Sequence, residues 1–197
     1  MLKAPGHVTL GMQAVVHEDV AGVRFRISMP SFFQSRVDGA AALVTEVRTA
    51  LGDWPARLVD AYGGVGLFSA TVGAASDVVL IEGSASACAD ARQNLIGDVA
   101  VVRAPVERWV PHSADAVIAD PPRAGLGKVG ASVLAATGAP VLVLVSCDPA
   151  SLGRDAALLA AHGYEHARSV VVDLFPHTAH VEVVTRFERA PARAAIS

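Results

Sequence analysis

The segment 146–149 (Ser-Cys-Asp-Pro) contains the side chain with the clearest chemical potential. Cys147 closes an apolar run typical of a buried strand, and Asp148 followed by Pro149 is a typical N-cap and first residue of a helix. A thiol beside a helix N-terminus has its thiolate form favoured, and a thiolate is a nucleophile. We therefore expect Cys147 to be a nucleophile, with a buried structural cysteine as the alternative. Cys88, inside an Ala-rich helical run, fits that structural role.

A second chemical candidate lies in the segment 175–182 (Phe-Pro-His-Thr-Ala-His-Val-Glu). Because side chains alternate along a strand, His180 and Glu182 share one face. A carboxylate near a nucleophilic cysteine is a candidate general base, and a solvated or capping glutamate is the alternative. His177, His180 and Glu182 resemble a metal-ligand set, but no partner cluster stands out elsewhere, so we predict no metal site.

A glycine-rich turn and a strand-end carboxylate indicate a nucleotide-type pocket. Residues 60–66 (Asp-Ala-Tyr-Gly-Gly-Val-Gly) follow a predicted strand and open a helix. Glu82 ends the next strand, where a carboxylate can accept hydrogen bonds from both ribose hydroxyls of an adenosine. The ligand could be a nicotinamide cofactor or S-adenosylmethionine. The glycines do not follow G-x-G-x-x-G, which argues against a dehydrogenase, and a plain tight turn remains the alternative.

The segment 120–123 (Asp-Pro-Pro-Arg) ends a further predicted strand. Its two prolines keep the chain extended and remove two backbone donors, so this loop is free of helix or sheet pairing. An Asp at such a strand end usually faces the ligand crevice, so Asp120 is a further candidate site residue. A simple Pro-rich exit loop is the alternative.

These segments depend on the regular elements that come before them. Strands are expected at residues 57–61, 78–82, 99–103, 116–119, 141–146, 169–174 and 180–187, and helices at 37–51, 66–72, 84–95, 129–137 and 150–162. Apolar strands separated by helices predict an α/β fold with a doubly wound, mostly parallel sheet. The connection 175–179 is too short for a parallel crossover, so one strand near the edge should be antiparallel. A short β-hairpin, with strands at 13–16 and 23–27 around a turn at 17–22, precedes this domain.

Composition excludes several classes of protein. With 197 residues, 52% hydrophobic and 18% charged, the chain is not intrinsically disordered, and two cysteines are too few for a disulfide scaffold or an iron–sulfur cluster. Residues 1–16 lack the apolar core of a signal peptide, and glycines and a proline interrupt the uncharged run 129–147, so we predict a cytoplasmic protein without a membrane span. The net charge of -3 gives no basic footprint for nucleic acid, so any such affinity must come from a local Arg patch or from other segments.

The chemical segments together resemble those of the RNA uracil-C5 methyltransferases, which make 5-methyluridine in tRNA and rRNA from S-adenosylmethionine. The segments that carry this resemblance are 60–68, Glu82, 120–126, 146–155 and 175–182, within a region from about Phe32 to Phe187. The resemblance implies a Rossmann-like class I methyltransferase fold, Cys147 as the nucleophile that adds to carbon 6 of uracil, and Glu182 as the base. Residues expected to bind or line the pocket of the methyl donor are Gln34, Asp60, Tyr62, Gly64, Glu82 and Asp120.

The chain departs from the family pattern at three positions, where Cys, a polar residue and Asn usually stand in place of Gly63, Leu67 and Arg36. The resemblance covers the catalytic domain only, without the N-terminal RNA-binding barrel of many members. We accordingly divide the chain into an N-terminal hairpin segment (1–35), the catalytic domain (36–189) and a tail (190–197). We expect a monomer that acts on an RNA uridine without a metal or iron–sulfur cluster in this chain.

Two other functions fit parts of the sequence. The Asp-Pro-Pro segment at 120–122 is also typical of amino-group methyltransferases that act on adenine, cytosine or glutamine. Those enzymes generally have an aromatic residue where Arg123 stands, and they do not use a cysteine such as Cys147. The departures at Gly63 and Leu67 and the acidic net charge also fit a catalytically silent module that binds RNA or a partner.

Overall fold

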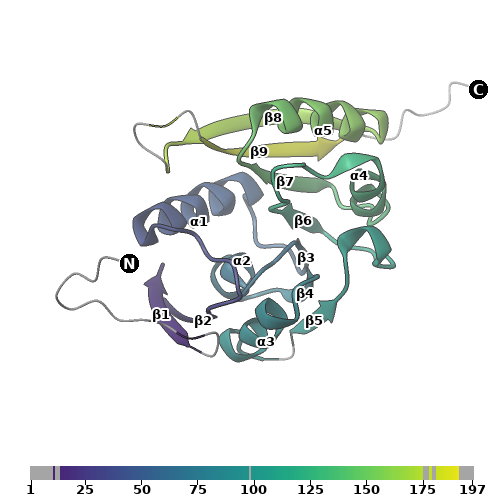
Figure 1. The fold of residues 1–197 in the computed structure, drawn as a ribbon. Coiled ribbons are helices and arrows are strands. Elements are labelled where there is room, and N and C mark those ends of the chain that lie inside the picture. The colour runs from purple at the N-terminus through teal and green to yellow at the C-terminus, as the bar shows by residue number, and fades with distance from the viewer. Residues whose placement is uncertain (1–10, 12–13, 98, 175–177, 179–180, 191–197) are drawn as a thin grey trace, which may run out of the picture.

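A central β-sheet organises the molecule, which we describe from a computed structural model covering residues 11, 14–97, 99–174, 178 and 181–190 (Figure 1). The seven strands of this sheet lie in the order β5-β4-β3-β6-β7-β9-β8. Their bounds are β3 Arg57–Ala61, β4 Asp77–Glu82, β5 Ala100–Arg103, β6 Ala116–Ala119, β7 Val141–Ser146, β8 Tyr164–Val172 and β9 Glu182–Arg189. The strands from β5 to β7 are parallel, and β9 is antiparallel to both β7 and β8. This confirms the predicted doubly wound sheet with a reversed strand near its edge.

Helices cover both faces of the sheet (Figure 1). They are α1 Val37–Leu51, α2 Leu67–Thr71, α3 Ala85–Asn94, α4 Gly127–Ala135 and α5 Pro149–Ala161, with a 3-10 turn at Val106–Arg108. Successive strand residues alternate between two apolar cores. Leu58 and Ile118 belong to the core shared with α1 and α2, whereas Val59 and Val117 belong to the core shared with α4 and α5. Because both faces are covered, every residue of β6 is buried, which explains its uninterrupted apolar sequence.

The strand order changes direction between β3 and β6. From β3 the chain proceeds outward to β4 and β5, then returns to place β6 on the other side of β3. At such a switch point the loops leaving the carboxyl ends of the two neighbouring strands separate and leave a crevice. The loops that follow β3 and β6 are those that carry the glycine-rich turn and the Asp-Pro-Pro segment.

The predicted hairpin is present, but its turn is shorter than expected. Strands β1 (Val15–Val20) and β2 (Val23–Ser28) form a separate two-stranded antiparallel sheet. The turn consists of Ala21 and Gly22 alone, both with positive φ (50° and 83°), which is typical of a tight two-residue hairpin turn. The polar residues 17–19, which we assigned to the turn, continue β1, because much of this strand is exposed and tolerates polar side chains.

Other differences concern element boundaries. Strand β8 begins at Tyr164, well before the predicted start at 169, because residues 165–169 are exposed on the edge strand and give no apolar pattern. Strand β9 begins slightly later than predicted, at Glu182, and helix α4 begins slightly earlier, at Gly127. Of the helices in the described part of the chain, none has the length and apolar character that crossing a bilayer would require.

Candidate active site

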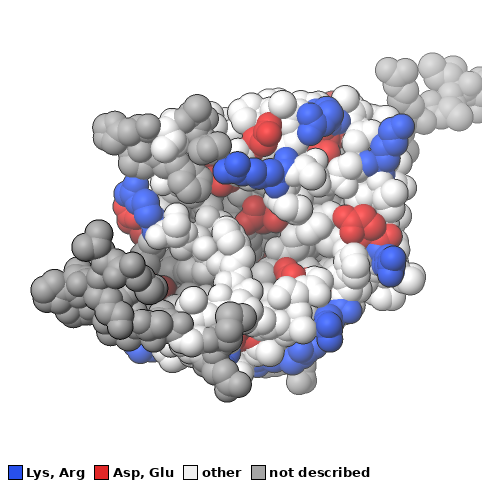
Figure 2. Space-filling model, viewed as in Figure 1, with Lys and Arg blue, Asp and Glu red and all other residues white. Residues whose placement is uncertain are grey.

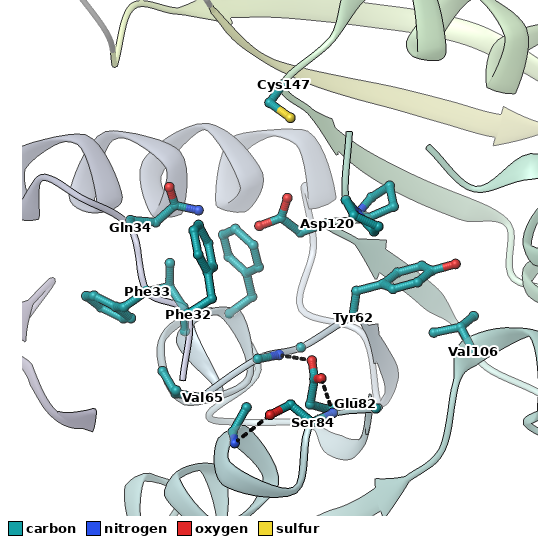
Figure 3. A pocket seen from close by; sticks show the side chains of 18 of the residues that line it. Phe32, Phe33, Gln34, Tyr62, Val65, Glu82, Ser84, Val106, Asp120 and Cys147 are labelled. Carbon is teal, nitrogen blue, oxygen red and sulfur yellow. Dashed lines mark hydrogen bonds between the residues drawn. The ribbon is translucent and has the colours of Figure 1, made fainter. Parts of the chain in front are cut away.

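A cavity of about 890 Å³ opens at the carboxyl ends of β3, β4, β6 and β7, at the switch point of the sheet (Figure 3). Its walls are largely apolar, and they include Phe32, Phe33, Val65, Leu67, Phe68 and Val106. The side chains that give it polar character are Gln34, Tyr62, Glu82, Asp120, Arg123, Cys147 and Glu182. The structure thus brings nearly all the predicted site residues to one cavity, although they come from separate segments of the chain.

Glu82 and the glycine-rich turn form one end of the cavity. The carboxylate of Glu82 accepts a hydrogen bond from the backbone N–H of Gly64 (3.0 Å) and another from that of Ser84 (2.6 Å). A carboxylate has about four lone-pair sites, so Glu82 can still accept hydrogen bonds from two ligand hydroxyls. Gly64 has a φ of 55°, a left-handed conformation that costs glycine nothing and that directs its N–H toward Glu82.

Asp60 lies beneath the same turn, and it does not line the cavity. It is fully buried, and one carboxylate oxygen accepts hydrogen bonds from the backbone N–H (2.9 Å) and the hydroxyl (2.6 Å) of Ser69. Its Oδ1 has no hydrogen-bond partner among the described residues. Burial raises the pKa of Asp60 to about 6, against the effect of the two Ser69 bonds. Its position suits it to fix the start of α2 under the turn.

Gly63, one of the three departures from the family pattern, has no room for a side chain in this structure. A Cβ atom at this position would lie 2.6 Å from Cγ of Leu80 and 3.2 Å from Cγ of Asp60. Leu80 therefore occupies the space that a cysteine side chain would need. Of the two other departures, Leu67 adds apolar surface to the cavity wall, and Arg36 precedes α1 and pairs with the exposed Asp38.

Tyr62 forms part of the cavity wall next to the glycine-rich turn. It is a non-glycine residue with a φ of 60°, and its hydroxyl donates a hydrogen bond to Glu107 (2.9 Å). Burial and the neighbouring Glu107 carboxylate raise the pKa of Tyr62 well above its ordinary value, so the hydroxyl stays protonated and remains a donor. The hydrogen bond holds the ring in the wall.

Cys147 and Glu182 meet at the other end of the cavity. In the antiparallel ladder Ser146 pairs with Val183, so the next residues on each strand, Cys147 and Glu182, lie opposite each other. The thiol of Cys147 points toward the cavity (Figure 3). The side chain of Glu182 is almost fully buried (6% exposed), and this desolvation raises its pKa to about 7, opposed by the positive charge of Arg123.

One prediction about Cys147 is wrong. We expected the N-terminus of the following helix to lower the pKa of the thiol, but burial raises it, and the Glu182 and Asp120 carboxyls raise it further. The first amides of α5 are already used, because Asp148 accepts hydrogen bonds from Ala150 (2.6 Å) and Ser151 (3.1 Å). Of the neighbouring charged side chains, Arg123 is the one that favours the thiolate.

Asp120 lies just past the end of β6, between the two ends of the cavity (Figure 3). Burial raises its pKa to about 8, and the nearby Glu182 and Asp60 carboxyls add to this shift. In the described structure Asp120 is therefore mostly protonated at neutral pH. A positively charged ligand in the cavity would favour its ionised form.

The predicted absence of a metal site concerns His177 and His180, which lie outside the described residues. Among the residues that the structure does describe, no group of three or more His, Cys, Asp or Glu side chains is placed to hold a metal ion.

The three carboxyls with raised pKa values predict an unusual dependence of stability on pH. Asp60, Glu182 and Asp120 have raised pKa values in the folded state, of about 6, 7 and 8, so they hold protons that the unfolded chain has already lost. Unfolding then releases protons, and the free energy of unfolding should fall by at least about 2 kcal/mol between about pH 5 and about pH 8. Urea unfolding at a series of pH values measures this slope.

The variant Asp120→Asn should flatten the slope between about pH 6 and about pH 8, because it removes the highest of the three pKa values. The matched control is Asp115→Asn, since Asp115 has a pKa lowered by Arg57 and titrates below this window. If the free energy of unfolding of the unaltered chain instead rises between about pH 5 and about pH 8, the pKa values of these carboxyls are not raised in the folded state.

The fold and the cavity at its switch point define the class of this protein, which has a class I methyltransferase fold. A tRNA (uracil-54, C5)-methyltransferase from Pyrococcus abyssi, solved in complex with S-adenosyl-L-homocysteine, matches it with a TM-score of 0.78 and 31% identity, covering 88% of this chain and 44% of that one. A putative RNA methyltransferase from Pyrococcus horikoshii, with a TM-score of 0.65 and 16% identity over 82% of this chain and 87% of its own, shares the fold.

Sequence comparison identifies the family. An uncharacterized RNA methyltransferase of Thermosynechococcus vestitus is 41% identical over 181 residues, covering 85% of this chain and 39% of that protein. The 23S rRNA (uracil(1939)-C(5))-methyltransferase RlmD of Alkalilimnicola ehrlichii is 33% identical over 199 residues, covering 89% of this chain and 44% of that protein. No protein-family model matches the chain. The chain belongs to the RNA methyltransferase family that includes the uracil-C5 enzymes, and it spans about two fifths of the length of these curated relatives.

Proposed function

We propose that this chain is the catalytic part of an S-adenosylmethionine-dependent methyltransferase that modifies carbon 5 of a uridine in RNA. The observation that carries this proposal is the pairing of Cys147 with Glu182 at one end of a cavity whose other end holds Glu82 and the glycine-rich turn. A nucleophile, a base and a nucleotide-type pocket are the three parts that this reaction requires. Since one chain supplies all three, a monomer is sufficient for the chemistry.

The donor end of the cavity fits S-adenosylmethionine. Glu82 has free lone pairs for two ribose hydroxyls, and Gln34, Tyr62 and Asp120 line the same space. When bound, S-adenosylmethionine supplies an electrophilic methyl group on a sulfonium. The carboxyl of Asp120 is ready to balance that positive charge, because it faces the cavity and would lose its proton beside a cation.

The target end fits the chemistry of uracil. Carbon 5 of uracil is a poor nucleophile, and addition of the Cys147 thiolate to carbon 6 makes it enolate-like, so that it can accept a methyl group. Glu182 then removes the proton that remains on carbon 5, the double bond between carbons 5 and 6 re-forms, and the thiolate leaves. With a pKa of about 7, Glu182 is partly ionised at neutral pH and has a basicity suited to this proton transfer.

The RNA itself must present a single uridine to this cavity. The cavity is a recess in the surface, so the target nucleotide has to be flipped out of any base stack to reach Cys147. In the space-filling view, Lys and Arg side chains lie at several places around the hollow, and acidic side chains lie both near its centre and beside some of these basic side chains (Figure 2). The basic side chains near the hollow support contacts with RNA phosphates there. We propose a tRNA or rRNA substrate in the cytoplasm.

Tritium release tests this function against the alternative of amino-group methylation. RNA from cells that lack the gene is labelled with tritium at carbon 5 of uridine and mixed with the protein and S-adenosylmethionine. Methylation of carbon 5 must expel that tritium into water, whereas methylation of an amino group leaves it in place. Release of tritium in step with methyl incorporation supports the proposal, and methyl incorporation without release contradicts it. Absence of both methyl incorporation and tritium release would indicate the silent module.

Glu82 should set much of the affinity for the donor. Replacing it with Gln removes the charge from both expected ribose hydrogen bonds, so we expect binding to weaken by about 1.5–3 kcal/mol. Calorimetric titration with S-adenosylmethionine measures this loss. Glu165→Gln, on the exposed part of β8, is the matched control and should bind as the unaltered chain does. Equal affinity of Glu82→Gln and the control would exclude Glu82 as the ribose acceptor.

A further inference from the structure

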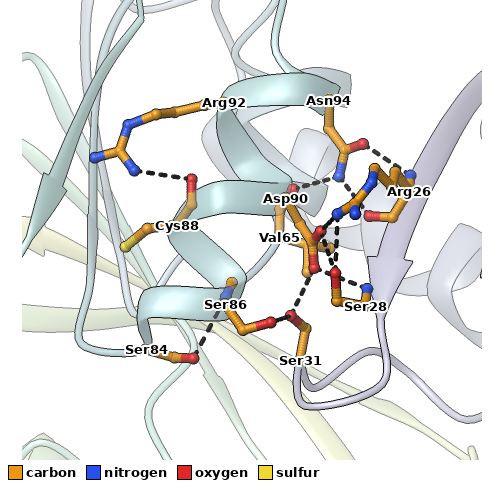
Figure 4. Close-up of polar contacts among 11 residues, drawn as sticks. Arg26, Ser28, Ser31, Val65, Ser84, Ser86, Cys88, Asp90, Arg92 and Asn94 are labelled. Atoms are coloured by element: carbon orange, nitrogen blue, oxygen red, sulfur yellow. Dashed lines mark hydrogen bonds and ion pairs between the residues drawn. The ribbon is translucent and has the colours of Figure 1, made fainter. Parts of the chain in front are cut away.

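Helix α3 carries two buried polar side chains that take no part in the proposed chemistry. Asp90 is fully buried, Asn94 is almost so, and they lie one helical turn apart on the same face (Figure 4). Both point toward the N-terminal hairpin. A buried carboxylate is costly unless it is paired, so the partners of Asp90 indicate what this side chain holds in place.

The hydrogen-bond partners that the structure gives Asp90 all come from one segment of the chain. Its carboxylate forms an ion pair with Arg26 and accepts hydrogen bonds from the backbone N–H (2.8 Å) and hydroxyl (2.8 Å) of Ser28 and from the hydroxyl of Ser31 (2.6 Å) (Figure 4). These donors run from β2 into the loop after it. The charge of Asp90 is therefore stabilised while this segment lies against α3.

Asn94 connects the same segment to the glycine-rich turn. Its side-chain oxygen accepts a hydrogen bond from the backbone N–H of Arg26 (2.8 Å), and its amide donates to the carbonyls of Arg26 (3.0 Å) and Val65 (2.9 Å). Val65 lines the cavity. One face of α3 thus holds two stretches of backbone that belong to different walls of the cavity.

The segment held by Asp90 leads directly into the opposite wall. Ser31, which also bonds to the hydroxyl of Ser86 (2.8 Å), is followed at once by Phe32, Phe33 and Gln34, all of which line the cavity. The ring of Phe33 packs on that of Phe25 in β2, with 5.7 Å between ring centres. Fixing Ser31 on α3 therefore fixes where these three side chains can lie.

We propose that Asp90, together with Asn94, is a positioning residue that sets the affinity for the methyl donor by holding the 32–34 wall in place, without touching the donor. This inference rests on the proposed function. If the wall is in place only part of the time, the apparent dissociation constant for the donor rises in inverse proportion to the fraction of molecules in which the wall is in place. A residue that only stabilises the hairpin would change the unfolding of that hairpin and leave donor affinity unaltered.

The variants Asp90→Asn and Ser31→Ala test this role, the first with a large expected loss of donor affinity and the second with a small one. Asp90→Asn keeps the shape but loses the charge, and we expect the dissociation constant for S-adenosylhomocysteine, measured by calorimetry, to rise on the order of tenfold. Ser31→Ala removes one of the donors to this carboxylate and should give a smaller rise in the same direction. The matched control is Asp115→Asn, which breaks another Asp–Arg pair, beside the amino ends of β3 and β6, and should leave the affinity unchanged.

Hydrogen exchange shows where the change occurs. In Asp90→Asn, peptides that cover residues 24–35 should exchange faster, because the Ser28 amide loses its carboxylate acceptor and the Arg26 side chain loses its ion pair, while peptides from β3 to β7 keep their protection. Faster exchange throughout the sheet would mean that Asp90 supports the whole fold, and it would overturn the proposal.

A double-mutant cycle connects Asp90 to the wall itself. If Asp90 acts through the wall, then in a chain that already carries Gln34→Ala the added change Asp90→Asn should raise the dissociation constant by clearly less than it does alone. Equal effects in both backgrounds, or an unchanged affinity in Asp90→Asn and Ser31→Ala, would overturn the inference while leaving the proposed function standing. Failure of the unaltered chain to bind S-adenosylhomocysteine would instead overturn the proposed function, and this inference with it.

Discussion

Replacing Cys147 with alanine is expected to reduce the rate of methyl transfer by at least about 10⁴-fold, because carbon 5 of uracil is never activated without the thiolate. The variant should still bind S-adenosylmethionine, since Glu82 and the glycine-rich turn lie at the other end of the cavity. Incorporation of a labelled methyl group into RNA measures the rate, and calorimetry measures the binding.

The control for this variant is Cys88→Ala. The thiol of Cys88 is buried in α3 and donates a hydrogen bond to the carbonyl of Glu82, so its removal should cost some stability and little activity. If Cys147→Ala retained a rate within about tenfold of the unaltered chain, the covalent mechanism would be excluded, because no second cysteine lies at the cavity among the described residues.

Glu182→Gln should fail at a later step and accumulate a covalent complex between protein and RNA. Addition of Cys147 to carbon 6 and acceptance of the methyl group do not require the base. Removal of the carbon-5 proton does, so the thiolate cannot be expelled. We expect a complex that survives denaturing electrophoresis and carries the labelled methyl group, and that is absent in the double variant with Cys147→Ala.

Glu188→Gln is the matched control for the base, because Glu188 lies on the same strand but is exposed and paired with Arg186. It should turn over without a trapped complex. If a folded Glu182→Gln protein released product at the normal rate, Glu182 would be removed from the mechanism, and its raised pKa would reflect burial alone.

Several residues of the cavity could be predicted from the sequence because they end or follow an apolar strand. Parallel strands bring their carboxyl ends to one edge of the sheet, so Glu82, Asp120 and Cys147 had to meet there once the strands were recognised. The position of Glu182 opposite Cys147 depends in addition on β9 lying between β7 and β8, a strand order that the sequence pattern did not predict. Gln34, which precedes α1, was predicted only from the resemblance to the uracil-C5 methyltransferases.

Other features depend on contacts that a sequence pattern does not encode. The direction of the Cys147 pKa shift is set by burial and by the carboxyls of Glu182 and Asp120, which come from distant parts of the chain. Asp60 stands at the end of β3, where we expected it to contact the methyl donor, but its side chain lies under the glycine-rich turn and bonds to Ser69. The Asp90–Arg26 pair joins residues far apart in the chain, and neither residue stands in a recognisable motif.

Mass spectrometry of 5-methyluridine in cellular RNA tests whether this protein methylates carbon 5 of uridine, because it detects the modified nucleoside whichever RNA carries it. Cells lacking the gene, in a strain with no second enzyme of this kind, are complemented with the unaltered gene or with the Cys147→Ala variant. We expect 5-methyluridine to be lost on deletion, to be restored by the unaltered gene, and not to be restored by Cys147→Ala. An unchanged level on deletion, or full restoration by Cys147→Ala, would contradict this expectation.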